Sequence, residues 1–210
     1  MAKTILFQGD SITDCGRSRE PKNANEALGA GYVSLVAARL LAIHMDRPLY
    51  IHNRGVSGNR VVDLYARWGV DGLNPCPDIV SILIGVNDAL RGTARNNGVE
   101  PERYQMFYQM VLDWTKKELP DARPVLMEPF LLPTNAVMNG FTAEMDRRRE
   151  IVRELAKANG ATFVPLQRVL VDASERAGAM EAILYDGVHP TLLGHQLIAD
   201  EWLKHAGDLI

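Results

Sequence analysis

Three polar side chains in this sequence have the types and spacing needed for nucleophilic catalysis. Ser11 follows the apolar run Thr4–Phe7 after a short Gly-containing loop, and near the other end of the chain Asp186 precedes His189 by three residues. A histidine held in one tautomer by a carboxylate can accept the proton of a serine hydroxyl. A tight turn with this i, i+3 spacing can supply the carboxylate locally. The pattern predicts Ser11 as nucleophile, His189 as general base and Asp186 as its orienting acid.

Taken singly, these features also have simpler explanations. Ser11 could be a helix N-cap, a position that serine favours, and Asp186 could merely cap backbone N–H groups of its turn. Asp186, His189 and His195 could instead bind a metal, although no upstream residue supplies an obvious further ligand. A phosphate-binding loop is disfavoured, because the loop around Ser11 places carboxylates where an anion would lie. The nucleophile hypothesis therefore needs support from other parts of the chain.

Two further loops carry groups that can stabilise a negatively charged intermediate. Gly58 has no side chain, so its N–H can approach an oxyanion closely, and Asn87 offers a neutral amide donor just after the apolar run Ile79–Ile84. Preorganised donors of this kind are each worth roughly 3 kcal/mol in acyl transfer. Alone, Gly58 and Asn87 are more often turn residues. Together with the Ser11 N–H, they predict an oxyanion hole.

The alternation of short apolar runs with segments of helical period predicts the scaffold that positions these residues. It is typical of an α/β protein whose parallel sheet has helices on both faces. Strands are expected at Thr4–Phe7, Leu49–His52, Ile79–Ile84, Val125–Met127 and Thr162–Val164, and helices at 31–44, 61–68, 101–119, 142–159, 166–177 and from about 191 to 205. Ligands in such sheets bind beyond the carboxyl ends of the strands. The loops that contain Ser11, Gly58 and Asn87 should therefore meet at one edge.

The sequence resembles the SGNH/GDSL hydrolases in four separate stretches. Gly9–Ile12, Gly58, Gly85–Asp88 and Asp186–Pro190 are similar to the four sequence blocks of that family, and the similarity extends from residue 4 to about 205. The resemblance implies a flavodoxin-like three-layer α/β/α sandwich with a central parallel five-stranded sheet. It also implies the triad Ser11–His189–Asp186 and an oxyanion hole formed by Ser11 N–H, Gly58 N–H and Asn87 Nδ2. Ile12 replaces the leucine of the GDSL pattern, which is a volume-conserving exchange.

A narrower resemblance is to the intracellular acetylxylan esterases. It rests on Gly9–Arg17, Gly29–Val33, Gly58–Asn59 with Ala66–Trp68, Ile84–Arg91 and His189–His195. It implies removal of O-acetyl groups from xylo-oligosaccharides or related carbohydrates, and nothing in the sequence calls for a cofactor or a metal. Because fold and triad do not determine what fills a pocket, two alternatives stay open. They are a thioesterase or lysophospholipase of the same superfamily, and a catalytically silent carbohydrate-binding module.

Position in the chain suggests three residues that contact the substrate. Arg60 follows the Gly58 loop, Tyr185 directly precedes the triad aspartate, and Phe130 follows the fourth expected strand. Each of these positions lies beyond the carboxyl end of a strand or beside the triad, where a ligand is expected. We therefore expect Arg60, Tyr185 and Phe130 to line the acyl or sugar site.

Other polar residues near these motifs are expected to have structural roles. Asp10 should anchor its loop through backbone N–H groups, and Asp14 and Asp88 should either anchor loops or form polar walls of the pocket. Cys15 is expected to pack as a small buried thiol behind the loop. His195 is expected to form a structural hydrogen bond.

Composition narrows the class of protein further. The chain has 210 residues, which suits a single domain spanning 1–210, and 47% of them are hydrophobic. With 23 Lys and Arg against 26 Asp and Glu, the charge does not predict a nucleic-acid partner. No apolar stretch predicts a membrane span, and the first residues do not form a secretory signal, so a cytoplasmic location is expected. The expected partner is a small acetylated carbohydrate or another short-chain ester, and a homo-oligomer is left open.

Overall fold

The computed structural model describes residues 2–210, without the side chains of residues 93–95. Its centre is a five-stranded parallel sheet with the strand order β2-β1-β3-β4-β5. The strands are β1 (Lys3–Gly9), β2 (Leu49–Asn53), β3 (Ile79–Leu83), β4 (Arg123–Met127) and β5 (Thr162–Val164). All five predicted strands are present, with ends that differ by no more than two residues from those expected.

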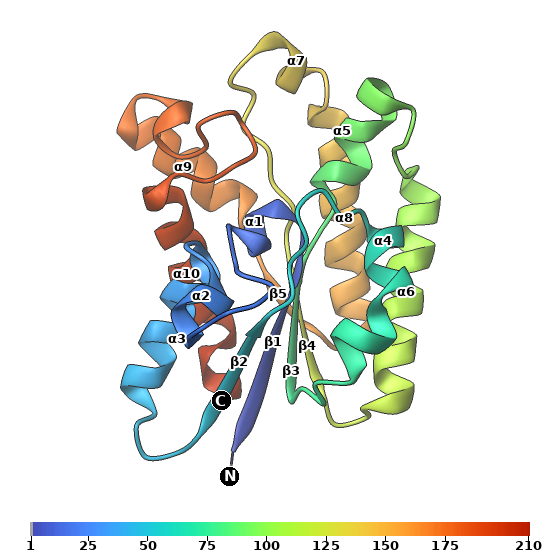
Figure 1. The fold of residues 1–210 in the computed structure, drawn as a ribbon. Coiled ribbons are helices and arrows are strands. Elements are labelled where there is room, and N and C mark those ends of the chain that lie inside the picture. The colour runs from blue at the N-terminus through green and yellow to red at the C-terminus, as the bar shows by residue number, and fades with distance from the viewer. Residues whose placement is uncertain (1) are drawn as a thin grey trace.

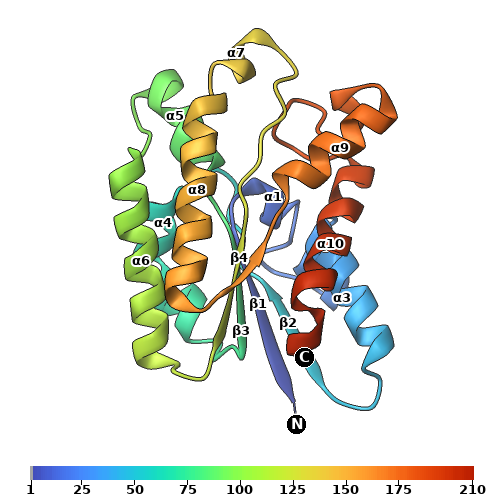
Figure 2. The same cartoon turned by 180° about the vertical axis from the view of Figure 1, so that it is seen from behind.

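Helices cover both faces of the sheet, which confirms the predicted three-layer arrangement (Figures 1 and 2). The main helices are α3 (Tyr32–Ile43), α4 (Val61–Ala66), α6 (Pro101–Glu118), α8 (Thr142–Asn159), α9 (Gln167–Ala177) and α10 (Leu192–Ala206). Four further helices, α1 (Ser11–Asp14), α2 (Ala24–Leu28), α5 (Val86–Arg95) and α7 (Ala136–Asn139), lie in segments where no helix was predicted. Among the described residues, no helix is both long and apolar enough to cross a membrane.

The two faces of the sheet contribute to two separate hydrophobic clusters. Successive side chains of β1 point to opposite faces, so Phe7 belongs to one cluster and Leu6 to the other. On the first face Trp202 packs 5.2 Å from Phe7, between ring centroids, and its Nε1 donates to Ser81 Oγ at 3.0 Å. On the second face the indole of Trp68 is fully buried. Both tryptophans therefore belong to the core and not to a ligand site.

The C-terminal part of the chain returns to the carboxyl edge of the sheet as a tight turn. Leu184 and Pro190 form an isolated antiparallel bridge, and the Tyr185 N–H donates to the His189 carbonyl at 3.1 Å. Helix α10 then begins with Thr191 as its N-cap, whose hydroxyl accepts from the Gly194 N–H at 3.2 Å. This arrangement holds the residues between 185 and 189 beside the loop that follows β1.

Candidate active site

Ser11, His189 and Asp186 form one continuous hydrogen-bonded chain. Ser11 Oγ lies 3.0 Å from His189 Nε2, and His189 Nδ1 lies 2.7 Å from Asp186 Oδ2. The other carboxylate oxygen of Asp186 accepts from the N–H groups of Val188 and His189 at 2.9 and 2.7 Å. Partial burial disfavours the charged form of Asp186, but these hydrogen bonds outweigh it and lower its pKa. The structure thus brings together the three residues predicted as a triad.

The turn between Asp186 and His189 depends on a glycine and on the segment after β4. Gly187 has φ +89°, and a Cβ there would lie 2.4 Å from the Leu132 carbonyl oxygen. The Gly187 carbonyl accepts from the Leu132 N–H at 2.9 Å. The 130–132 segment therefore supports the catalytic turn from behind.

Ser11 is the first residue of α1, and Asp10 is the N-cap of that helix. The Asp10 carboxylate is buried and accepts from the Ile12 N–H at 3.0 Å, so it anchors the loop as expected. Burial raises the pKa of Asp10 to about 6, although the hydrogen bond from Ile12 opposes the rise. Because Asp10 takes the capping role, the Ser11 hydroxyl is left to face His189.

The three predicted oxyanion donors lie on loops that follow three adjacent strands. Ser11 follows β1, Gly58 follows β2 with φ +81°, and Asn87 lies in the first turn of α5 after β3. Asn87 Nδ2 donates to the Asn59 carbonyl at 3.2 Å, which ties the second and third loops together. Within the part of the chain that the structure describes, neither the Ser11 N–H nor the Gly58 N–H donates to another protein group. Both remain able to bind an oxyanion.

Two carboxylates fix the loop that contains Gly58. Asp14, in α1, accepts from the Ser57 N–H at 2.9 Å, and Asp88, in α5, accepts from the Val61 N–H at 3.0 and 3.3 Å. The loop is therefore held on both sides of Gly58 by residues of the two neighbouring loops. Asp14 and Asp88, whose roles the sequence left open, are loop anchors.

The electrostatic environments of these two anchors differ. Burial favours the neutral form of Asp14, but hydrogen bonds from Arg19 and Ser57 prevail and lower its pKa. Asp88 is fully enclosed, and its burial raises its pKa to about 7 despite the hydrogen bond from Val61. The two anchors therefore titrate on opposite sides of the usual aspartate range.

Arg67 is a positioning residue that the sequence motifs did not identify. Its Nε donates to Asn59 Oδ1 at 2.7 Å, one terminal nitrogen donates to the Arg54 carbonyl at 2.9 Å, and the other reaches the Gly9 carbonyl at 3.4 Å. It therefore joins the loops that follow β1 and β2. The only available signal was an arginine inside the Ala66–Trp68 stretch, and its spacing gave no indication of these partners.

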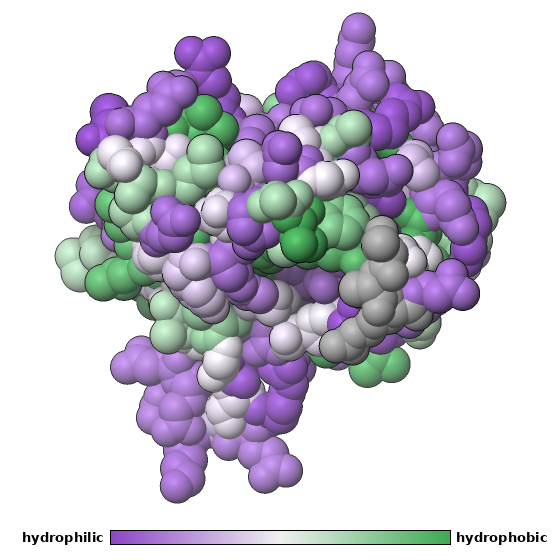
Figure 3. Space-filling model, turned by 90° about the horizontal axis from the view of Figure 1, so that it is seen from above, coloured by the Kyte–Doolittle hydropathy of each residue, from purple (hydrophilic) through white to green (hydrophobic). Residues whose placement is uncertain are grey.

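The triad opens into a cleft of about 410 Å³ lined by residues such as Ser11, Cys15, Tyr185 and Leu192. Tyr185, predicted to contact substrate, is 60% exposed, and its ring stacks on His189 with centroids 5.8 Å apart. The view from above, onto the carboxyl ends of the strands, shows hydrophobic groups scattered among hydrophilic ones (Figure 3). On the face shown in Figure 3, outside the grey atoms, no long hydrophobic groove is visible.

The other two predicted substrate contacts do not line this cleft. Phe130 is 1% exposed and belongs to the hydrophobic core, so it has no surface with which to touch a ligand, and its prediction as a substrate contact is wrong. Arg60 pairs with Asp63 at 2.8 Å and donates to the Asn97 carbonyl at 2.8 Å. It lines a separate polar pocket beside the Gly58 loop.

Cys15 and His195 form a second pair of side chains at the back of the cleft. His195 Nδ1 accepts from the Tyr32 N–H at 3.2 Å, so in the neutral ring Nε2 carries the proton and faces Cys15 Sγ at 3.4 Å. Burial lowers the pKa of His195 to about 4, and the ring is neutral at pH 7. His195 thus has the structural role predicted, because both of its ring nitrogens are engaged by Tyr32 and Cys15. Cys15, in contrast to the prediction, is half-buried and lines the cleft instead of packing behind it.

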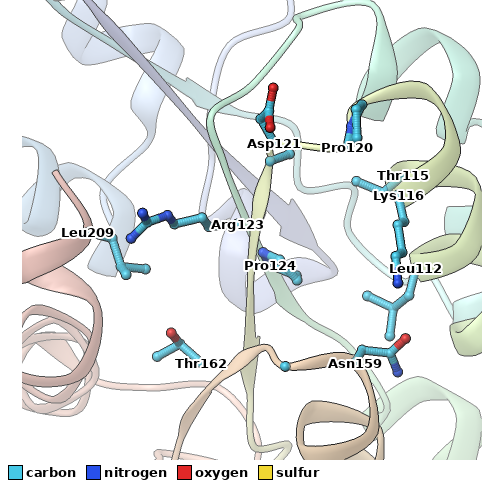
Figure 4. A pocket seen from close by; sticks show the side chains of 12 residues that line it. Leu112, Thr115, Lys116, Pro120, Asp121, Arg123, Pro124, Asn159, Thr162 and Leu209 are labelled. Atoms are coloured by element: carbon cyan, nitrogen blue, oxygen red, sulfur yellow. The ribbon is translucent and has the colours of Figure 1, made fainter.

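A cavity of about 530 Å³ lies at the opposite end of the sheet (Figure 4). Its lining includes Arg123 and Pro124 at the start of β4 and Thr162 at the start of β5. Because all strands are parallel, this cavity is separated from Ser11 by the length of the sheet. It does not take part in the chemistry of the triad.

Comparisons with known proteins agree on one family. Residues 7–197 match the model of the GDSL-like lipase/acylhydrolase family. An acetylxylan esterase of Geobacillus stearothermophilus is 34% identical over 208 residues, which cover 97% of this chain and 93% of that protein. A crystal structure described as a GDSL-like lipase from Parabacteroides merdae ATCC 43184 has a TM-score of 0.93 and 39% identity, with coverage of 99% and 96%.

Solved structures of the Geobacillus acetylxylan esterase, Axe2, include several catalytic mutants. One of them has a TM-score of 0.87 and 32% identity, and covers 96% of this chain and 93% of that chain. The catalytic mutants replace a serine, an aspartate or a histidine, and the last two lie three positions apart.

Proposed function

The chain belongs to the GDSL-like lipase/acylhydrolase family and is a serine esterase of the SGNH type, and we propose that it removes acetyl groups from short carbohydrates such as xylo-oligosaccharides. The observation that carries this proposal is the Ser11–His189–Asp186 chain of hydrogen bonds at a small cleft. The catalytic aspartate and histidine of the Geobacillus enzyme have the same three-residue spacing as Asp186 and His189.

The first half of the proposed reaction transfers the acyl group to the protein. His189 Nε2 accepts the Ser11 proton while Ser11 Oγ attacks the ester carbonyl carbon, and Asp186 stabilises the imidazolium that forms. The carbonyl oxygen becomes an oxyanion bound by Ser11 N–H, Gly58 N–H and Asn87 Nδ2. When this intermediate collapses, the bond to the alcohol oxygen breaks and His189 gives its proton to the departing alcohol.

The second half releases the acid by the same route. His189 takes a proton from a water molecule, whose oxygen attacks the acyl-enzyme carbonyl. The oxyanion forms in the same hole, and its collapse breaks the bond to Ser11 Oγ, which regains a proton from His189. The products are the free alcohol and a carboxylic acid, and the reaction as written consumes only the ester and water.

The cleft supports a short acyl group more than a long one. Ser11 shares its cleft of about 410 Å³ with Ile12, Cys15 and His195. A thioesterase or lysophospholipase needs a continuous apolar groove for its acyl chain, and Figure 3 shows scattered hydrophobic groups instead. Tyr185 and Leu192, which are 60% and 76% exposed, offer apolar surface beside the triad to the alcohol part of the substrate.

The proposal is tested by comparing acyl groups and alcohols. We expect p-nitrophenyl acetate to be hydrolysed with a kcat/KM at least about tenfold above that of the octanoyl ester, since extra methylenes find no groove. On a panel of acetylated sugars, acetate release from xylo-oligosaccharides should exceed release from acetylated glycerol. Faster hydrolysis of the octanoyl ester would favour the lysophospholipase alternative, and the absence of acetate release from every sugar would refute the carbohydrate substrate.

Three further predictions from the sequence belong to this proposal. They are a cytoplasmic location, the absence of a nucleic-acid partner, and one domain that spans residues 1–210. The sequence leaves a homo-oligomer open, and light scattering can measure the oligomeric state.

A further inference from the structure

A polar pocket of about 490 Å³ lies beside the oxyanion loops, and we call it the Arg60 pocket. Its lining includes Arg60, two residues after Gly58, and Asp88, the residue that follows Asn87. Two peptide units span at most about 7 Å. The backbone of Arg60 therefore lies within that reach of Gly58, although the pocket that Arg60 lines is separate from the cleft that contains Ser11.

The Arg60 pocket is lined by groups of both charges. Three arginines and three acidic residues line it: Arg60, Arg103, Arg148, Asp88, Glu100 and Glu144. An anion or a cation would meet repulsive as well as attractive groups there. A neutral ligand with many hydroxyl groups suits this lining, because guanidinium groups donate to its oxygens and carboxylates accept from its O–H groups. Phe141 adds an apolar surface for the C–H face of a sugar ring.

Arg148 is a fixed charged group in the wall of this pocket. It is 2% exposed, and its terminal nitrogens donate to the Glu144 carbonyl at 2.9 Å, to the Glu144 carboxylate at 2.6 Å and to the Val99 carbonyl at 2.6 Å. These bonds hold the guanidinium in place, so the lining of the pocket is formed before a ligand arrives.

We propose that the Arg60 pocket binds the sugar units next to the acetylated one, so that it selects oligosaccharides over monosaccharides. This inference rests on the proposed function, because it places the scissile ester at Ser11. With the ester there, the adjoining units extend over the Gly58 loop and present neutral hydroxyl groups to Arg60, Arg103 and Glu100.

Arg103 provides a direct test, because it is 56% exposed and pairs only with Glu100, at 3.0 Å, among the described residues. We expect the wild-type protein to have a kcat/KM about tenfold higher for an acetylated xylotetraose than for acetylated xylose. In Arg103→Ala this ratio should fall by about fivefold, mainly through a higher KM for the tetramer. The matched control is Arg147→Ala, which removes an equally spaced surface pair with Glu150 outside the pocket and should keep the wild-type ratio.

Binding of unacetylated xylotetraose to Ser11→Ala, followed by calorimetry, separates this proposal from the proposed function. Binding that weakens severalfold on adding Arg103→Ala supports the pocket, even if no acetylated sugar is hydrolysed and the function is refuted. Hydrolysis of acetylated sugars with equal kcat/KM for monomer and tetramer would uphold the function and overturn the pocket. If Arg103→Ala and Arg147→Ala changed the tetramer-to-monomer ratio of kcat/KM equally, the proposed role of the Arg60 pocket would also be overturned.

Discussion

The turn that carries Asp186 and His189 is exposed, and its carboxylate bonds only to neighbours in sequence among the described residues, whereas the loop that carries Gly58 is held by buried carboxylates from distant segments. The side chains of His189 and Asp186 are 37% and 46% exposed, and the partners of the Asp186 carboxylate lie within three residues. Asp14 and Asp88, by contrast, reach the Gly58 loop across 43 and 27 residues of sequence. The Asp186–His189 turn contributes reactive groups, and the Gly58 loop contributes a fixed oxyanion donor.

Because of this difference, we expect substitutions in the two regions to affect activity and stability differently. Exposed charged pairs contribute little to the free energy of unfolding because solvent screens them, so the catalytic turn can be altered without loss of the fold. Buried carboxylates that accept backbone N–H bonds contribute more, because their removal leaves donors unsatisfied. Substitutions in the turn should change turnover alone, and substitutions at the loop anchors should change turnover and stability together.

The largest expected effect is that of His189→Ala. Loss of the general base should lower kcat for p-nitrophenyl acetate by at least about 10⁴-fold. The midpoint of thermal unfolding, measured by circular dichroism, should stay within about 2 °C of the wild type because the ring is partly exposed. A variant that keeps a tenth of the wild-type kcat would exclude His189 as the base.

Removal of a single oxyanion donor should have the next largest effect. Asn87→Ala should reduce kcat by about a hundredfold or more, with little change in KM, because the amide acts on the charge formed in the transition state. Asn87→Asp is a useful companion, since it keeps the size of the side chain but loses the donor. A loss of only a few-fold in both variants would remove Asn87 from the hole.

At the loop anchors we expect a smaller loss of activity joined to a loss of stability. Asp14→Ala removes the acceptor of the Ser57 N–H and should lower kcat by about tenfold and the free energy of unfolding by roughly 1–3 kcal/mol. Asp172→Ala, which breaks an exposed pair with Arg168, serves as the control and should change neither quantity. If Asp14→Ala keeps both wild-type values, Asp14 does not anchor the loop.

The pH dependence of stability distinguishes the two anchors. The pKa of Asp88 is raised to about 7 in the folded protein, so its contribution to stability is complete below its usual pKa of 3.8 and is lost as the pH rises through 7. The pKa of Asp14 is lowered, so its contribution is complete above 3.8 and is lost as the pH falls through the folded value. Asp88→Asn should therefore remove a slope of up to about 1.4 kcal/mol per pH unit between pH 4 and 7.

Urea titrations at several pH values measure that slope. Asp14→Asn should leave the slope between pH 4 and 7 in place. It should lower stability by a constant amount above about pH 4, and this difference from the wild type should shrink as the pH falls below 4. An unchanged slope in Asp88→Asn would show that Asp88 does not carry the proton assigned to it.

The sequence predicted the parts of the site that depend on local spacing. Asp186 and His189 are paired through a turn of four residues, and Ser11 and Asn87 lie in the segments that follow predictable strands. Helix α1 was missed because four residues carry little periodic signal, and α5 because it contains Gly92, a residue that favours turns and loops. Even so, the loops lie where the strands required, since the parallel sheet fixes the edge at which its carboxyl ends meet.

The features that the sequence did not predict correctly depend on tertiary contacts. Phe130 lies at the correct end of β4, but its side chain points into the core, while Leu132 binds the Gly187 carbonyl. Position along a strand predicts which edge a residue occupies but not which way its side chain points after the strand has ended. Arg67 and Asp88 likewise find their partners through packing of segments that are distant in sequence, and no motif encodes those contacts.

The most direct test of the central claim is covalent labelling of the nucleophile. The protein should react with a fluorophosphonate to give one adduct per chain in the intact mass spectrum, and peptide mapping should place that adduct on Ser11. Prior incubation with p-nitrophenyl acetate should slow the labelling, and Ser11→Ala should not be labelled. An adduct on another residue, or equal labelling of Ser11→Ala, would contradict the assignment of Ser11 as the nucleophile.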